Sequence, residues 1–147
     1  MSQTVDLNPT PNKIMDGVSI NDITSKSQLV GIGTDRDVYK INNNTVIKIS
    51  KRPNDNINQT SREIDFYNNV KKSGASEKFA KITEYKYGTY ICQEYLNTNK
   101  HISSKDIEKW KSEVISHGIT VYDDRKVNFG YRGDNLVMLD YAGCFFN

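Results

Sequence analysis

The sequence has few of the residues that cross-link a small fold or stiffen its loops. Two cysteines, three prolines and one tryptophan occur among 147 residues. One pair of cysteines cannot build the disulfide framework of a small secreted domain. The opening residues MSQTVDLNPTPN lack the apolar segment of a signal peptide. We therefore expect a cytoplasmic protein in which Cys92 and Cys144 are free thiols.

Long apolar runs and an excess of one charge are also missing. No stretch approaches the roughly 20 apolar residues that cross a bilayer, so we expect no membrane partner. The formal net charge of +2 is close to balance, which gives no electrostatic reason to expect nucleic acid binding. The abundance of Asn, Lys and Ile is typical of AT-rich coding sequences and hints at a phage or mobile-element source.

The length suits one domain with a core of its own. Residues 1–24 are polar, contain Pro9 and Pro11 and show no sustained period, which predicts a flexible N-terminal arm. The later segments predict an α+β fold, with strands at 28–33, 37–42 and 46–50, a helix at 60–74, a hairpin at 79–96, a helix at 103–118 and short strands and loops from 119 to 141.

Lys48 is a charged residue inside the apolar run VIKI. Side chains alternate along a strand, so Val46, Lys48 and Ser50 share one face while Ile47 and Ile49 share the other. An unpaired buried ammonium group is unfavourable. A buried Lys48 therefore requires an anion.

Glu63 is the anion that the helix spacing offers. It begins the i, i+3, i+4, i+7 series that continues through Phe66, Tyr67 and Val70, which places it on the apolar face of the predicted helix. An ion pair with Lys48 would satisfy both charges. The alternative is an edge lysine with its ammonium group in water and a Glu63 that supports the first helical turn, where Thr60 and Glu63 have the spacing of a capping box.

Gly31 and Gly33 lie in the loop between the first two predicted strands. Glycines there allow backbone N–H groups to approach a phosphate closely, although a G-x-G pair alone is usually only a turn. A second set of polar residues, Asp123, Asp124, Asn128 and Asp140, surrounds the short strands near the C-terminus. Their oxygens suit Mg²⁺, and stabilisation of turns is the alternative reading.

The order of these segments resembles the protein-kinase family over residues 28–143. GIGTDRDVYK is similar to the kinase glycine-rich loop, VIKI to the strand with the phosphate-positioning lysine, and QEYL to the hinge between lobes. YDDRKVN is similar to the catalytic loop and DYAG to the metal-binding segment. The resemblance implies an α+β fold: a small lobe of antiparallel sheet plus one helix at 25–96, then a severely truncated large lobe of one helix and catalytic β-hairpins at 97–147.

The resemblance also implies ATP and Mg²⁺ as ligands. Lys48, held by Glu63, would contact the α- and β-phosphates. Asp123 would be the base or orienting residue for the attacking hydroxyl, and Arg125 would stabilise the transferring phosphoryl group. Asn128 and Asp140 would hold Mg²⁺, and Gly31 and Gly33 would lie in the loop above the phosphates. Val38 and Val46 would line the adenine slot, with Gln93 at the back of the pocket. The backbone of Glu94 and Leu96 would bind the edge of the adenine ring.

The sequence departs from the kinase pattern at several points. Arg36 stands where the third loop glycine is expected, which predicts poorer closure over the phosphates. Val121-Tyr122 replaces His-Arg before the catalytic Asp, and Tyr141-Ala142 replaces Phe-Gly after the metal-binding one. Only seven residues follow Asp140. We therefore expect the apolar side of the helix at 103–118 and the final CFF to be exposed, and a protein partner or homodimer to cover them.

Two functions follow from these observations. The first is a minimal Mg-ATP-binding phosphotransferase that acts on itself, on a small molecule or on an acceptor presented by a partner. The second is a pseudokinase that binds a protein as a regulatory module without catalysis.

Overall fold

The computed structural model describes residues 20–55 and 58–147, which form two compact units. Unit 1 comprises residues up to Ile64 together with Ile82–Tyr95, and unit 2 comprises Asp65–Lys81 and Leu96–Asn147. The helix α2 (Gln59–Ser73) contains one of the boundaries between them. Most of the predicted flexible arm lies outside the described residues, and its last part belongs to a short helix, α1 (Ile20–Ser25).

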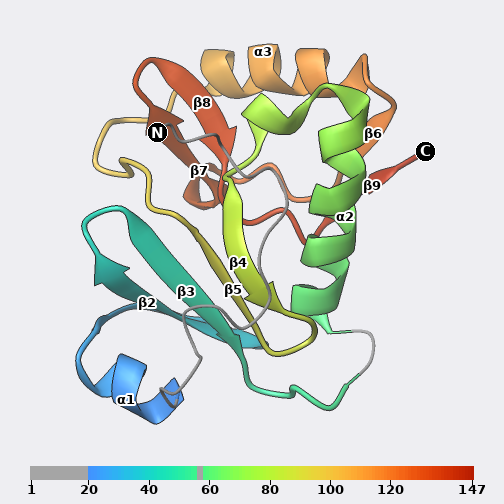
Figure 1. Cartoon of the computed structure of the whole chain (residues 1–147). Coiled ribbons are helices and arrows are strands. Elements are labelled where there is room, and N and C mark those ends of the chain that lie inside the picture. The colour runs from blue at the N-terminus through green and yellow to red at the C-terminus, as the bar shows by residue number, and fades with distance from the viewer. Residues whose placement is uncertain (1–19, 56–57) are drawn as a thin grey trace, which may run out of the picture. The chain divides into compact units, whose positions relative to one another are not determined.

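Unit 1 is built on a five-stranded antiparallel sheet in the order β1-β2-β3-β5-β4 (Figure 1). The three N-terminal strands, which the sequence predicts, pair as an antiparallel meander, and the later hairpin joins its β3 edge through β5. The strands are β1 (Gln28–Ile32), β2 (Arg36–Asn42), β3 (Thr45–Ser50), β4 (Ile82–Lys86) and β5 (Tyr90–Glu94).

The two faces of β3 differ as the strand period predicts. Ile47 packs with Tyr90 and Cys92 in an apolar cluster, which Ile49 of the same face joins. On the other face, Ser50 donates a hydrogen bond to the Thr60 hydroxyl at 2.6 Å. That face therefore meets the first turns of α2.

Asn58 caps the N-terminus of α2, and the predicted capping box is wrong. The Asn58 side-chain oxygen accepts a hydrogen bond from the Ser61 backbone N–H at 2.9 Å. Its amide nitrogen donates to the Gly88 carbonyl at 2.7 Å, which ties the helix start to the β4–β5 turn. Thr60 is instead buried inside the helix. The predicted helix at 60–74 ends where the sequence indicates, because α2 stops at Ser73 and Gly74 follows it with φ of +85°.

Unit 2 has one long helix, α3 (Ser104–Ile115), and an aromatic core. Trp110 of α3 packs edge to face on Phe79 and Phe129, with ring centroids 5.6 and 5.0 Å apart. The other elements are the end of α2, two short 3₁₀ turns at Ser76–Lys78 and Lys126–Asn128, and the strands β6 (Ile119–Val121), β7 (Phe129–Arg132), β8 (Asn135–Met138) and β9 (Cys144–Phe146), which pair as β6-β9 and β7-β8.

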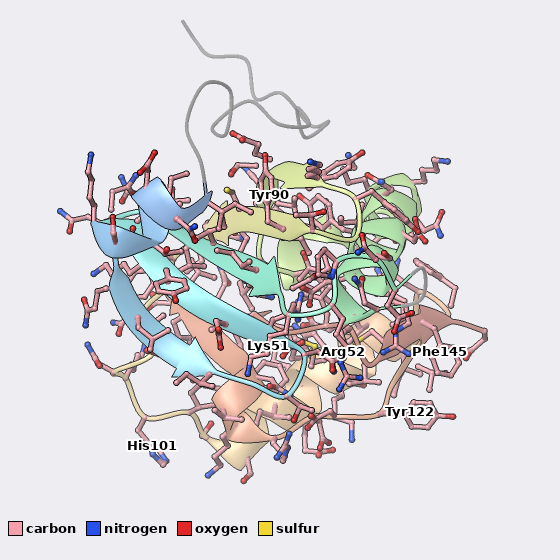
Figure 2. The ribbon with its side chains drawn as sticks, turned by 90° about the horizontal axis from the view of Figure 1, so that it is seen from below. Lys51, Arg52, Tyr90, His101, Tyr122 and Phe145 are labelled. Carbon is pink, nitrogen blue, oxygen red and sulfur yellow. The ribbon has the colours of Figure 1, made fainter. Side chains whose placement is uncertain are left out.

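The predicted exposure of the apolar side of α3 is wrong. Ile107, Trp110 and Val114 are all buried, because the aromatic core of unit 2 covers this face. The final CFF is only partly exposed: Cys144 is buried, while Phe145 is 43% exposed and contacts the Tyr122 ring at 5.1 Å (Figure 2). Separately, no helix within residues 20–55 and 58–147 is long and apolar enough to cross a bilayer.

The cap at Asn58 gives a test of the fold. We expect Asn58→Ala to lower the free energy of unfolding by about 1 to 2 kcal/mol, because the Ser61 N–H loses its acceptor at the helix terminus. Urea denaturation measures the change. Asn69→Ala, at an exposed position of the same helix, should be nearly neutral. Equal effects of the two substitutions would contradict the capping role.

Candidate functional site

In unit 1, Lys48 and Glu63 form the ion pair that the strand and helix periods predict. The Lys48 Nζ lies 2.9 Å from Glu63 Oε1. Lys48 is only 4% exposed and Glu63 is fully buried. The solvent-exposed alternative for both residues is therefore wrong.

Arg36 is a third member of this buried cluster, and its contact with Glu63 was not predicted from the sequence. Its NH1 group donates to the same Glu63 Oε1 atom at 2.7 Å, and its side chain is buried. Arg36 faces Ser50 in the β2–β3 pairing, two positions from the Val38–Lys48 pair, so both cations project from one face of the sheet. The sequence had placed Arg36 in the loop before the predicted strand at 37–42, and nothing there indicated that its side chain is buried.

The charges around Glu63 set its ionisation. Burial alone raises the pKa of the Glu63 carboxyl, but the charges and hydrogen bonds of Arg36 and Lys48 outweigh burial and lower it from 4.5 to about 2. Glu63 is therefore ionised at neutral pH. The buried cluster is held together by charge-assisted hydrogen bonds on one carboxylate oxygen.

The other residues predicted to contact a nucleotide from unit 1 lie on or beside its central strands. Val38 is half-buried on β2, and Val46 is buried on β3. Gln93, buried, and Glu94, half-buried, end β5. Gly31 is in β1 and Gly33 follows it, whereas Leu96 is the first residue of the adjoining segment of unit 2.

In unit 2, hydrogen bonds bring the predicted catalytic and metal-binding segments together. The Asn128 side-chain nitrogen donates to the Asp123 carbonyl at 3.1 Å. The Leu139 N–H donates to the Asn128 carbonyl at 2.7 Å, which places Asn128 beside the residue before Asp140. The β6–β9 pairing completes the arrangement, with the Tyr122 N–H donating to the Gly143 carbonyl.

Tyr141 anchors the segment that carries Asp140. Its ring is fully buried against Phe79, and its hydroxyl donates to the Ala80 carbonyl at 2.8 Å. A phenylalanine would lack this hydroxyl and leave the buried Ala80 carbonyl without that donor. The Phe-to-Tyr departure from the kinase pattern therefore has a packing role of its own.

Asp123 and Asp124 have different partners. Lys111 of α3 binds Asp124 at 2.8 Å. Arg125 donates hydrogen bonds to both carboxylate oxygens of Asp123, from Nε to Oδ1 and from NH2 to Oδ2, each at 2.8 Å. The hydrogen bond from Arg125, with smaller contributions from Asn128, lowers the pKa of Asp123 from 3.8 to about 2. Asp123 is therefore ionised at neutral pH, with both of its carboxylate oxygens bound to Arg125.

Asn128 and Asp140 fit a magnesium ion by the chemistry of their donors. The Asn128 amide nitrogen donates to the Asp123 carbonyl, so the amide oxygen is the atom of this side chain that would bind a metal ion. Asp140 adds a carboxylate whose charge also raises the pKa of Arg125, after the larger effect of Asp123. In residues 20–55 and 58–147 no three His, Cys, Asp or Glu side chains gather as a metal site. Mg²⁺ commonly takes one or two protein oxygens and completes its shell with waters and phosphates.

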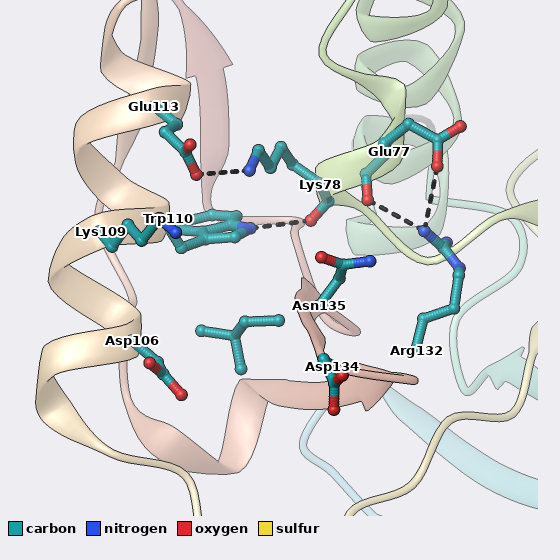
Figure 3. A pocket seen from close by; sticks show the side chains of 10 residues that line it. Glu77, Lys78, Asp106, Lys109, Trp110, Glu113, Arg132, Asp134 and Asn135 are labelled. Atoms are coloured by element: carbon teal, nitrogen blue, oxygen red, sulfur yellow. Dashed lines mark hydrogen bonds and ion pairs between the residues drawn. The ribbon is translucent and has the colours of Figure 1, made fainter.

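A pocket of about 370 Å³ lies in unit 2 beside Trp110 and contains none of the predicted site residues (Figure 3). Ion pairs cross its walls, with Lys78 on Glu113 at 2.5 Å and Arg132 on Glu77 at 3.5 Å. The Trp110 Nε1–H donates to the Lys78 carbonyl at 3.0 Å. Four of the charged residues that line the pocket thus bind one another in two pairs.

The comparisons with known proteins point to one fold. No family profile and no curated protein matches the sequence. Among solved structures, the aminoglycoside phosphotransferase APH(2'')-IIa in its streptomycin-ATP ternary complex is similar with a TM-score of 0.59 at 13% identity, over 100% of this chain and 75% of that chain. A Legionella pneumophila kinase bound to IP6 gives 0.49 at 15% identity, over 81% of this chain and 49% of that chain.

The likeness to APH(2'')-IIa confirms the predicted fold class. The chain has an α+β, protein-kinase-like fold, with a small lobe of antiparallel sheet plus one helix. In the described residues, the portion after the small lobe consists of one α-helix, a 3₁₀ turn and two-stranded sheets. At 13% identity the likeness shows the fold alone.

The depressed pKa of Glu63 predicts a pH dependence of stability. Because its folded pKa lies below its ordinary value, its ionisation stabilises the fold above about pH 4.5, and this stabilisation is lost as the pH falls toward 2. We expect Glu63→Gln to flatten that part of the stability profile and to destabilise the protein at pH 7 by about 3 to 5 kcal/mol, because two buried cations lose their carboxylate. Chemical denaturation between pH 2 and 7 measures both effects.

The matched control is Glu108→Gln, at an exposed position of α3. It should retain the parent's pH profile. A Glu63→Gln profile that parallels the parent from pH 5 to 2 would contradict the ion-pair assignment.

The Asp123–Arg125 contact predicts a coupled titration. We expect Arg125→Gln to move the pKa of Asp123 from about 2 up toward 3.8, because the neutral amide removes the charge and the paired hydrogen bonds. Carbon NMR of the Asp123 carboxyl follows the titration. Arg52→Gln, at an exposed position of unit 1, should leave it unchanged, and an unmoved Asp123 in Arg125→Gln would refute the contact.

Proposed function

We propose that this chain is a kinase-like, cytoplasmic protein that binds Mg-ATP and transfers its γ-phosphoryl group. The observation that carries the proposal is the buried Lys48–Glu63 pair, at 2.9 Å, on the strand and helix where a protein-kinase-like fold holds its phosphate-binding lysine. We propose residues 25–96 as the small lobe and 97–147 as the large-lobe portion.

Lys48 would bind the α- and β-phosphates, and Glu63 would hold its ammonium group in place. Val38 and Val46 would line the adenine slot. The backbone of Glu94 and Leu96 would bind the adenine edge, with Gln93 behind it. The burial of Val46 and Gln93 supports this arrangement, because an adenine ring is bound in an apolar slot with a few polar contacts.

Asn128 and Asp140 would hold Mg²⁺. The bound ion would neutralise charge on the phosphates. Asp123 would orient the acceptor hydroxyl. As the hydroxyl oxygen forms its bond to phosphorus, the bond to ADP breaks and the hydroxyl proton passes to solvent water. Arg125 would leave Asp123 and bind the oxygens of the transferring phosphoryl group instead. The hydrogen bonds that join the Asp123, Asn128 and Leu139 segments support these roles.

We propose a small molecule as the acceptor, ahead of the chain itself or an acceptor presented by a partner protein. The similar structure APH(2'')-IIa is described as a ternary complex with streptomycin and ATP, which pairs this fold with a small-molecule ligand. Streptomycin itself is not proposed as the acceptor, because 13% identity does not transfer a substrate.

A specific observation favours the second function, a pseudokinase that regulates a protein partner without catalysis. Both oxygens of Asp123 are bound by the neighbouring Arg125. If this contact persists with nucleotide bound, Asp123 cannot orient an acceptor. The exposed Tyr122–Phe145 ring pair would then be a surface for a protein partner or a second copy of the chain.

Thermal unfolding with and without Mg-ATP tests the nucleotide site. At 100 times its dissociation constant the ligand should add about 2.7 kcal/mol to the stability of the parent protein. We expect Lys48→Ala and Asp140→Ala each to lose most of this gain, because they remove a phosphate contact and a metal ligand. The gain is compared within each variant, so a loss of intrinsic stability does not enter the result.

The matched controls are Lys72→Ala and Asp134→Ala, both at exposed positions. They should keep the full ligand effect. No stabilisation of the parent would refute nucleotide binding and leave the protein-binding function. Stabilisation without ADP formation against a panel of hydroxylated small molecules would favour the pseudokinase.

A further inference from the structure

The loop that resembles a glycine-rich phosphate loop is closed on itself. The Gly33 N–H donates to the Arg36 carbonyl at 2.8 Å. The Lys51 ammonium group binds the Gly33 carbonyl at 2.6 Å, and the Lys51 N–H donates to the Asp35 carbonyl at 2.8 Å. The Gly33 amide is thus used within the loop, where a phosphate-binding loop would direct it at the ligand.

The same contact accounts for the glycine at position 33. A Cβ atom there would lie 3.0 Å from the Arg36 carbonyl oxygen, which is too close without a shift of the backbone. The glycine therefore permits the close turn of the loop. Its presence does not by itself require a phosphate.

Two buried cations near the end of this loop, Arg36 and Lys48, offer another way to bind an anion. Arg36 and Lys48 project from the same face of β2 and β3, and both contact Glu63 Oε1, at 2.7 and 2.9 Å. All three side chains are more than nine-tenths buried. Glu63 neutralises one of the two positive charges, so the cluster keeps a net positive charge, and a charge in a low-dielectric setting attracts an anion more strongly than it would in water.

We propose that Arg36, together with Lys48, binds the phosphates of the nucleotide in place of backbone amides of the loop. This inference rests on the proposed function and specifies its ligand class: a polyphosphate, recognised by an arginine fork and an ammonium group. Arginine suits this task because its planar guanidinium presents several N–H donors in a fixed geometry that matches phosphate oxygens. The arginine in the position of the third glycine is then part of the phosphate site, contrary to the expectation that it weakens the site.

Calorimetric binding of Mg-ATP and of inorganic tripolyphosphate tests the inference, with adenosine as the ligand that lacks phosphate. The variants are Arg36→Gly, which restores the glycine of the kinase pattern, and Arg36→Lys, which keeps the charge and removes the fork. We expect Arg36→Gly to weaken ATP and tripolyphosphate at least tenfold, and Arg36→Lys to weaken them less. Adenosine binding should stay the same in both variants, which a general loss of structure would not allow.

Arg52→Gly, at an exposed loop position, is the matched control and should bind all three ligands like the parent. If Arg36→Gly binds ATP as tightly as the parent or more tightly, the inference fails while the proposed function stands. If the parent binds neither ATP nor tripolyphosphate, the proposed function fails and the inference with it. Should Arg36→Gly not fold cooperatively, Arg36→Lys decides, since an unchanged affinity for tripolyphosphate in that variant overturns the inference.

Discussion

The burial of one carboxylate, Glu63, is the constraint on which the organisation of unit 1 depends. A buried ionised carboxylate is strongly unfavourable unless cations and hydrogen-bond donors surround it. Lys48 from β3 and Arg36 from β2 meet that need on one oxygen atom. The cluster therefore fixes how two strands and the first turns of α2 face one another. A well-packed apolar cluster can stabilise a protein as well as buried ion pairs do, so stability alone does not require three charges at this place.

Unit 2 arranges its polar residues by a different means. An aromatic core around Phe79, Trp110 and Phe129 supports short strands whose backbone hydrogen bonds set the Asp123, Asn128 and Asp140 segments beside one another. The buried Tyr141 holds the last of these segments through its hydroxyl. Charge binds the cluster in unit 1, whereas packing and backbone pairing position the cluster in unit 2. Catalysis of phosphoryl transfer depends on positioning and electrostatics, so the proposed function would use both means.

The periodicity of the strand and helix predicted the buried ion pair. Contacts made by side chains between distant segments could not be predicted in this way. The two-residue period of VIKI and the helical spacing from Glu63 were enough to predict the Lys48–Glu63 pair. The capping box failed because Asn58, just before the helix, binds Ser61 and Gly88 at once, a contact between distant segments. The role of Arg36 was not predictable, because a residue type at a loop end does not reveal whether its long side chain turns inward. The covering of α3 likewise depends on Phe79 and Phe129 from other segments.

We propose that Lys48, paired with Glu63, binds phosphate, and the other proposed roles depend on this contact. The most direct measurement is the NMR signal of the Lys48 ammonium group, assigned through Lys48→Arg, during titration with Mg-ATP and separately with adenosine. Binding of a phosphate oxygen should shift this signal in a saturable way with Mg-ATP and leave it in place with adenosine. A Lys48 signal that stays unchanged at millimolar Mg-ATP would contradict the account and reduce the cluster to a structural ion pair.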